Sequence, residues 1–223
     1  MKKFIIALLV IIVVVVGGFY AAISIPKEVK VEWSEEDWQS YLEKGNITFT
    51  EDRASIDDIL TGNYQGIGAE PIDTFVTNEE VSAMINMTTK ETGLFQDVNM
   101  RFLGDDRMEV SGTIGDNIDT LIEKYPEVAK YEKYLAPAKG KTVYMKTTLK
   151  NVTGNNFEAH VEDLRLGNLP LPEKVVNKNM TEVGTMANNI LDKIEGLNIE
   201  KFDITEEGFH YKGTIPTQIQ SLP

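Results

Sequence analysis

The feature that most constrains this fold is a long amphipathic segment between residues 164 and 197. Pro170 and Pro172 end the element before it, because proline has no backbone donor and holds φ near about −65°. Apolar residues then recur at alternating steps of four and three, the spacing of one stripe along an α-helix: Val176, Met180, Val183, Ala187, Ile190 and Ile194. We expect Gly196 to close this helix. Such a helix is unstable alone in water, so it needs a sheet to cover its stripe.

Three pairs of alternating apolar and polar stretches supply strands for that sheet. The pairs turn at residues 104–106, 153–156 and 206–208, where Gly, Asn, Asp and Glu allow tight connections. In the second pair, Val143, Met145 and Leu149 share one face. The sequence therefore predicts an α+β fold in which antiparallel hairpins pack on a long helix.

The N-terminal part of the chain is strongly apolar. No charged residue occurs from Phe4 to Ile25, which is long enough to cross ~30 Å of hydrocarbon at 1.5 Å per residue. Lys2 and Lys3 precede the run, and the positive-inside rule keeps such lysines in the cytoplasm. We predict that residues 1–25 form a single-pass transmembrane anchor in the cell membrane, with the N-terminus cytoplasmic and the rest of the chain outside.

A cleaved signal peptide is the competing interpretation, with Ala22 and Ser24 as the small residues before the cut. We disfavour it because the apolar run exceeds the usual ~7–15-residue core of a signal peptide. A cut after Ser24 would also leave Pro26 beside the scissile bond. The chain has no cysteine, so it carries no lipid-modified anchor and no disulfide, and an exported domain of this kind favours a bacterial source.

The remaining chain divides by composition into three parts. Residues 26–72 are predicted to be a stalk with one short helix, capped by Ser34 and ended by Gly45, and the glycine-rich stretch 62–71 is predicted to be a loop. Residues 73–216 are predicted to be the folded extracytoplasmic domain, whose first helix begins with a capping box from Thr77 to Glu80. Residues 217–223 are expected to be a tail.

The net negative charge of the chain limits the kinds of partner that it can bind. The formal charge of −13 and the pI near 4.7 argue against nucleic acid, and an anionic membrane surface would also repel such a protein. The one basic window, Lys124–Lys141, is interleaved with Tyr125, Tyr131 and Tyr134. It is either a solvated helix face with snorkelling lysines or a lid or membrane-touching element.

Catalytic chemistry is sparse in this sequence. It has no cysteine nucleophile, no Gly-X-Ser-X-Gly elbow, no phosphate-binding loop and no His-Glu-X-X-His motif. His160 and His210 both alternate away from apolar neighbours, so we predict that they face solvent. The acid pairs 57–58 and 105–106 lack the spacing of a calcium loop. We therefore expect no enzyme activity, no catalytic residue, no metal and no cofactor.

Several motifs together resemble a known family. Thr-Asn-Glu-Glu-Val at a helix start, VSGTIG on a strand, LGNLPLPEKVVN before the long helix and GFHYKGTIP on the last strand, behind an uncleaved anchor, are similar to the YpmS-type family of Gram-positive membrane-anchored proteins. That family looks like part of a wider group of extracytoplasmic domains related to tubular lipid-binding folds. The resemblance covers about Asp73–Pro216, and the stalk is longer than the family pattern. It implies a curved antiparallel sheet wrapped on the long helix, with an apolar groove for a lipid tail and no established reaction.

We therefore expect a non-enzymatic, membrane-tethered module that binds a lipid or another amphiphile in an apolar groove. Methionines favour this, because flexible thioethers line adaptable apolar sites as well as filling cores. Most of the following fall on predicted inward faces: Met84, Met100, Met108, Met145, Met180 and Met186. The alternative is an interaction or scaffold domain of the cell envelope, with an envelope protein as partner, a packed core and no ligand. The candidate groove residues are Val143, Met145, Leu149, Val176, Met180, Val183, Ala187 and Ile190.

Overall fold

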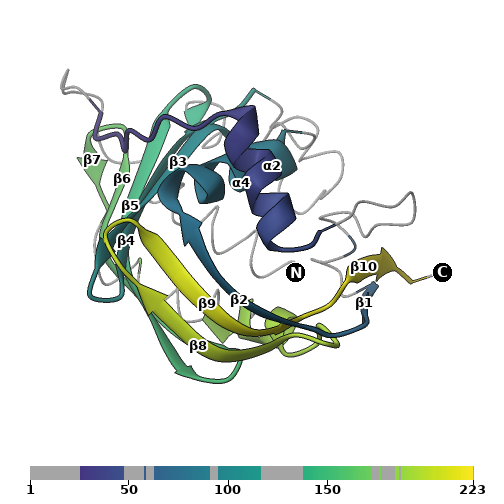
Figure 1. The fold of residues 1–223 in the computed structure, drawn as a ribbon. Coiled ribbons are helices and arrows are strands. Elements are labelled where there is room, and N and C mark those ends of the chain that lie inside the picture. Colours follow the sequence, from purple (N-terminus) through teal and green to yellow (C-terminus); the bar gives the residue numbers. More distant parts are fainter. Residues whose placement is uncertain are drawn as a thin grey trace.

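The structure is a computed structural model that describes residues 26–47, 58, 63–90, 95–116, 138–171, 176, 184–185 and 187–222. Within these ranges two helices and ten strands are described from end to end (Figure 1). The α+β class expected from the sequence is confirmed. In chain order the elements are α2 (Glu35–Lys44), β1 (Tyr64–Ile67), β2 (Glu70–Thr77), α4 (Asn78–Thr89), β3 (Phe95–Gly104), β4 (Arg107–Ile114), β5 (Thr142–Thr153), β6 (Asn156–Leu166), β7 (Leu169–Pro170), β8 (Asn198–Ile204), β9 (Gly208–Ile215) and β10 (Gln218–Ser221).

The largest sheet has the antiparallel strand order β3-β4-β5-β6-β7. The predicted hairpins β3–β4 and β5–β6 are both confirmed, and β4 pairs with β5 to join them. Val110, Met145 and Leu164 lie opposite one another across three strands, so they share one face of the sheet. We call this the inner face. The opposite, outer face carries Ser111 and Tyr144, which are also register partners.

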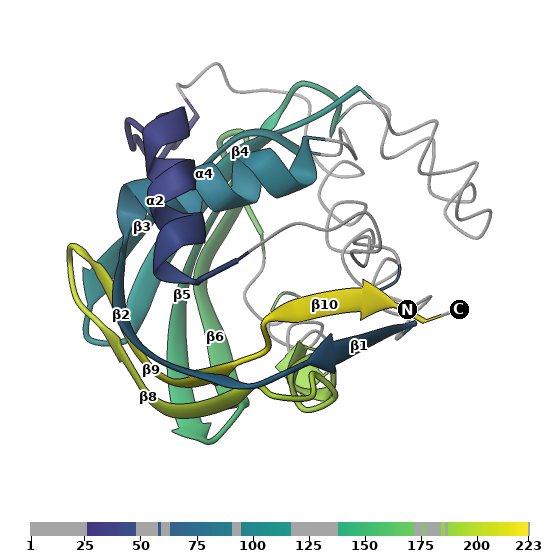
Figure 2. The same cartoon turned by 45° about the vertical axis from the view of Figure 1, so that its right-hand side comes forward.

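A second sheet has the order β2-β9-β8 and contains the third predicted hairpin, β8–β9, and β1 and β10 form a third, two-stranded sheet. The β2–β9 ladder leads directly into the β1–β10 ladder, so a long curved two-stranded ribbon runs along one side of the molecule (Figure 2). Two predictions are therefore wrong. Residues 62–71 are not simply a loop, because they contain β1 and the start of β2, and residues 217–223 are not a tail, because Gln218–Ser221 pairs with β1.

Aromatic rings join the two sheets. Phe102 of β3 meets Phe209 of β9 edge-on at 5.5 Å between ring centroids, and Phe209 lies 4.9 Å from Phe202 of β8. Phe157 of β6 then meets Phe202 at 5.2 Å. Aromatic pairs in these geometries contribute about 0.5–1.5 kcal/mol each beyond the area that they bury. This series of ring contacts holds the β8–β9 hairpin against strands β3 and β6 of the larger sheet.

Helix α4 closes the free edge of β3. Its capping box is confirmed, with the Thr77 side chain accepting from the Glu80 amide and the Glu80 carboxylate accepting from the Thr77 amide. Asn78, Ser82 and Asn86 lie four residues apart on one side of the helix and bond the main chain of β3 at residues 102, 100 and 98. Since an edge strand presents unpaired backbone groups, these three side chains replace a missing neighbouring strand.

The described part of the predicted stalk packs on the domain, so the stalk prediction is wrong there. Val29 is 2% exposed on the outer face of the large sheet, and its amide donates to Ser111 Oγ at 2.8 Å. Helix α2 does have the predicted Ser34 cap, but it packs beside α4 and buries Trp38 to 8% exposure. Burial of Val29 and Trp38 removes apolar surface from water, which a solvated stalk would leave exposed.

The end of the long C-terminal segment also differs from expectation. Residues 187–191 are helical, and turns occupy residues 192–196, so Gly196 does not directly follow the helix. The Ile190 carbonyl accepts from the Tyr64 hydroxyl at 2.8 Å, which satisfies a helix-end acceptor from outside the helix. Gly196 has φ +84°, and a Cβ there would lie 2.1 Å from the Gly68 carbonyl oxygen. The backbone of this turn therefore packs directly against the backbone of the ribbon at Gly68.

Candidate functional site

The inner face of the large sheet is the candidate site. Two packed clusters occupy its ends: Val161, Leu164 and Val176 form one, and Val76, Val81, Phe102 and Ile204 form the other. The members of both clusters are at most 8% exposed. The clusters therefore contain the fully packed part of the described core that touches this face.

The middle of the inner face is covered less well than its ends. Val110 and Met145, which pair across the central strands β4 and β5, are only partly buried. Tyr144, the next residue along β5, points to the outer face and is 1% exposed. In a sheet whose core lies on the inner face, central inward residues are expected to be the most buried. The next inward residue on β5, Thr147, is 1% exposed, so the incomplete burial of Val110 and Met145 does not continue to it, and we call this pair the apolar strip.

The predicted groove residues separate into three groups. Val143 and Met145 pack against the cluster that holds Val176, so the structure brings together the predicted strand and segment residues at this point. Leu149 instead packs on the second cluster, beside Phe102. Ala187 is exposed and Ile190 is partly buried, while Met180 and Val183 lie outside the described residues. Residues 124–137 of the basic window, which include its three tyrosines, also lie outside them.

Methionines concentrate where burial is incomplete. Met100 and Met108 on the inner face and Met84 on α4 are partly buried and pack against the second cluster. Met145 lies on the same face, against the first cluster. Unbranched thioether side chains rearrange easily and fill irregular space, so a surface made of them adapts to apolar ligands of different shape. Sequence reasoning predicted these inward positions, and the structure confirms them for these four methionines.

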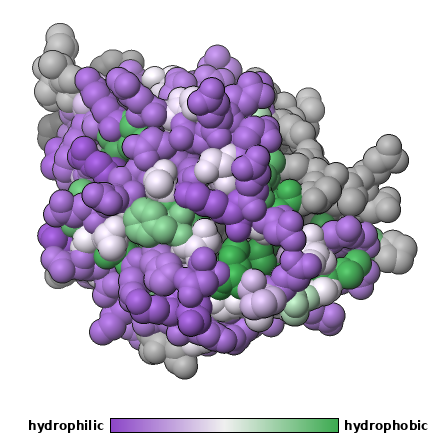
Figure 3. All heavy atoms as spheres, viewed as in Figure 1, coloured by the Kyte–Doolittle hydropathy of each residue, from purple (hydrophilic) through white to green (hydrophobic). Residues whose placement is uncertain are grey.

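Apolar residues reach the molecular surface in two places. Figure 3 shows them between the lower end of α2 and the strands β2 and β9, with hydrophilic residues around them. In addition, Ile67 on β1 is 39% exposed and Leu222 after β10 is 37% exposed. The β1–β10 ribbon thus exposes apolar as well as polar side chains.

The outer face holds a charged cluster of a different kind. Glu109 is 7% exposed, pairs with Arg101 and accepts from the Tyr144 hydroxyl at 2.8 Å. Burial, together with the neighbouring Glu109 carboxylate, raises the pKa of Tyr144 far above its ordinary value. Lys27 lies 4.0 Å from the centroid of the Tyr144 ring. Tyr144 therefore stays a neutral donor, and the cluster fixes the N-terminal segment rather than presenting a reactive group.

The two histidines lie on outward-facing strand positions. His160 is exposed on β6, as predicted. His210 is about one third exposed on β9, where its Nε2 lies 2.6 Å from Asp73 Oδ1 of β2. The hydrogen bond with His210, and the charges of His210 and Lys212, lower the pKa of the Asp73 carboxyl. Within the described residues, no group of three or more His, Asp or Glu side chains is arranged to hold a metal ion.

Comparison of the chain with protein-family models, with curated proteins and with solved structures finds no match. The family resemblance of its motifs therefore stays a prediction. No helix in the described ranges, from residue 26 onward with their gaps, is long and apolar enough to cross a membrane. The uncharged run Phe4–Ile25 lies outside those ranges, so the predicted anchor is not described either. The class that the geometry defines is an α+β domain whose described strands form three antiparallel sheets, with a partly buried apolar pair, Val110 and Met145, on the inner face of the largest.

Two features of the site region were missed by sequence reasoning. The side chains of α4 that bond β3 are typical of a solvated helix face, since Asn and Ser are polar. Their regular spacing of four residues was the available signal. The series of ring contacts was missed because Phe157, Phe202 and Phe209 come from strands far apart in the chain. Nothing in the local pattern of any one strand indicates which rings will meet.

Proposed function

We propose that this chain is a membrane-tethered module on the outer side of the cell membrane that binds a lipid or another amphiphile without catalysing a reaction. The single observation that supports it best is the partly buried pair Val110 and Met145 at the centre of the inner face. Ligand pockets are mostly apolar, and the composition of this strip beside the first packed cluster agrees with such a site. Apolar side chains also reach the surface between α2 and the strands β2 and β9.

Binding rather than catalysis is supported by the chemistry around the strip. Glu109 and Asp73, two titratable groups with well-defined partners, lie on outward faces of the sheets, and a third, Glu80, is paired between helices α2 and α4. The inner face of the central strands carries Val, Met and Leu side chains and the hydroxyl of Thr147, which donates to the His160 carbonyl. A surface of this composition recognises an acyl chain by burial alone.

An interaction or scaffold domain of the cell envelope is the second candidate. The observation that favours it is the tight packing of both clusters, since Val161 and Val176 are each 1% exposed. If the whole interior were packed in this way, no room would remain for a ligand and the partner would bind on the surface.

The experiment that separates these functions uses residues 27–223 purified without detergent. On the proposed function, extraction and mass spectrometry recover bound lipid, and the protein takes up a fluorescent fatty acyl probe. Val110→Trp and Met145→Trp should each expel the lipid and block the probe, with a loss of stability below about 1 kcal/mol, because the new ring occupies ligand space.

The matched control is Val161→Trp, at a fully buried position on the same face. It should cost about 1–3 kcal/mol or more by overpacking while leaving Val110 and Met145 in place. Should the purified protein carry no lipid and take up no probe, and should all three tryptophans destabilise it alike in urea unfolding, the scaffold function replaces the lipid-binding one.

A further inference from the structure

The N-terminal segment of the described chain is fastened across one corner of the large sheet. Lys27 Nζ lies 3.4 Å from Asp163 of β6 and 4.0 Å from the Tyr144 ring centroid of β5. Thr142 Oγ1 donates to Glu28 at 3.3 Å, and the Val29 amide donates to Ser111 Oγ of β4. The segment thus crosses β6, β5 and β4 in turn. Its start lies at the β6–β7 side of the sheet.

Very little chain separates this corner from the apolar run. Ile25 is the last residue of the run, and Val29 is already 2% exposed in the domain. Four residues span at most about 14 Å even when fully extended. The polar headgroup layer on each side of a bilayer is itself about 5–8 Å thick. An anchor that ends at Ile25 therefore leaves at most about 6–9 Å between Val29 and the outer edge of the headgroup layer.

Basic residues gather at the corner of the sheet that lies next to the anchor. The corner carries Lys27, Lys141 and Arg165 against Asp163 and Glu28, and Lys27 and Arg165 share the Asp163 carboxylate. It is therefore a cationic spot on a protein with a net charge of −13. An anionic headgroup layer attracts basic residues at its surface, by about 1 kcal/mol each.

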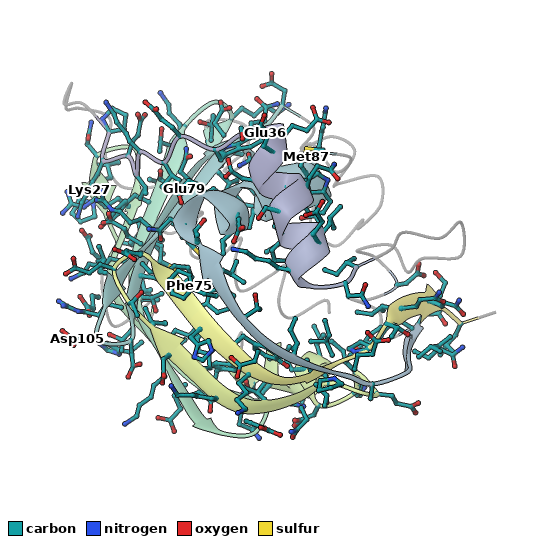
Figure 4. The ribbon with its side chains drawn as sticks, viewed as in Figure 1. Lys27, Glu36, Phe75, Glu79, Met87 and Asp105 are labelled. Carbon is teal, nitrogen blue, oxygen red and sulfur yellow. The ribbon has the colours of Figure 1, made fainter. Side chains whose placement is uncertain are left out.

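The acidic residues gather toward the other end. Asp105 and Asp106 form the β3–β4 turn, and Glu206 and Glu207 form the adjacent β8–β9 turn. Figure 4 shows Lys27 and Asp105 well apart along the sheet. The anionic surface that repels these turns would attract the corner, so electrostatics and tether length favour the same orientation.

We propose that this corner, formed by residues 26–29, 139–142 and 163–170, rests on the phospholipid headgroup layer of the bilayer that holds the anchor. The proposal rests on the anchor in the proposed function and not on the ligand. The β5–β6 turn then points away from the membrane. Along β6, Asn156 at this turn lies nine residues from Arg165, or about 30 Å farther out. The domain stands with its strands rising from the membrane, directly on its anchor.

The test uses the full chain, which has no cysteine and so allows single labelling sites. Pro170→Cys places a donor dye at the corner, and Asn156→Cys places it at the β5–β6 turn, both at exposed positions. Each labelled chain is inserted into vesicles of phosphatidylcholine and phosphatidylglycerol that contain an acceptor-labelled lipid. Energy transfer should be at least about twofold higher from residue 170, given the ~30 Å difference in height. Urea unfolding checks that both labelled chains fold.

The matched control inserts twelve Gly and Ser residues between Ile25 and Pro26, which should reduce the difference in transfer. Equal transfer from both sites in the chain without the spacer, with the protein held in the vesicles, overturns the proposal. If instead the chain washes off the vesicles in alkaline carbonate, the anchor itself fails. That outcome rejects the membrane tether of the proposed function, and it is distinguishable from a wrong orientation.

Discussion

Glu80 is a buried carboxylate that fastens helix α2 to helix α4. It is 3% exposed, lies 2.7 Å from Lys44 Nζ, and accepts from the Ser40 hydroxyl at 2.5 Å and from the Thr77 amide at 3.0 Å. Burial by itself raises the pKa of Glu80. The hydrogen bonds from Lys44, Ser40 and Thr77 outweigh burial, so the pKa of this carboxyl lies below its ordinary value.

Glu80→Gln should therefore lower the free energy of unfolding by about 2–3 kcal/mol at pH 7, because Lys44 loses a buried partner. A lowered pKa in the folded state means that Glu80 contributes its stability above its unfolded pKa of about 4.5 and loses it as the pH falls through the folded value. The difference between the two proteins in urea unfolding should shrink below pH 4.5.

Glu79→Gln is the matched control, since it removes the same charge from the same helical turn at a residue beside Glu80 (Figure 4). We expect a change within about 0.5 kcal/mol at either pH. Equal effects of the two substitutions, or a Glu80→Gln deficit that does not vary with pH, would contradict this assignment.

At the scale of elements, the edge of β3 is closed by side chains instead of by a strand. Asn86 gives the clearest case, because its amide group donates to the Val98 carbonyl and accepts from the Val98 amide at 2.9 Å. Asn86→Ala should cost about 1–3 kcal/mol by leaving a buried backbone group unsatisfied. Hydrogen exchange should accelerate at the Val98 amide first.

Thr88→Ala provides the comparison on the same helix. Thr88 bonds only the carbonyls of Met84 and Ile85 within its own helix, so its loss should leave exchange at Val98 unchanged. Faster exchange throughout β3 in both proteins would mean that α4 stabilises the sheet by packing and not through these bonds.

Regular elements with a strong local signal could be predicted from sequence. The β5–β6 hairpin has alternating residues and a Gly154 with φ +52° in its turn, and both helices have their capping-box residues. By contrast, β1 and β10 are only four residues long and pair across more than 150 residues of chain. Glycines that mark a loop elsewhere serve here for close backbone contact, so composition alone predicted the wrong state for residues 62–71.

For the candidate site, the sequence predicted which face of an element a residue occupies, but not which cluster it packs against. Strand parity placed Val143 and Met145 on the inner face, and the stripe placed Val176 against them. Leu149 packs elsewhere because the inner face is long enough to touch two clusters, and parity fixes a face without fixing a position along it. Ala187 is exposed because the segment contacts β6 here through the next residue, Asn188, which bonds the main chain of Phe157, and not through the predicted apolar stripe.

At the scale of the whole molecule, residues 26–33 are part of the domain. They gave no sequence signal because they cross the strands and add no strand of their own, so one buried side chain and a few hydrogen bonds hold them. Val29→Ala should lower the free energy of unfolding by about 1–3 kcal/mol through the cavity it leaves.

Lys30→Ala, at the exposed neighbouring position, should change stability by less than about 0.5 kcal/mol. A stalk detached from the domain predicts no effect from either substitution. Urea unfolding of residues 27–223 and of the two variants measures the difference directly.

The backbone contact between the C-terminal turn and the ribbon also limits how this protein can evolve. A Cβ at Gly66 would lie 2.1 Å from the Glu195 carbonyl oxygen, and one at Gly196 would lie 2.1 Å from that of Gly68, so no side chain fits at either place. Neutral substitutions can accumulate at exposed positions around them, but they cannot replace these two glycines. Orthologues that have diverged almost everywhere else should still carry glycine at both positions, or should have lost the bend of the ribbon altogether.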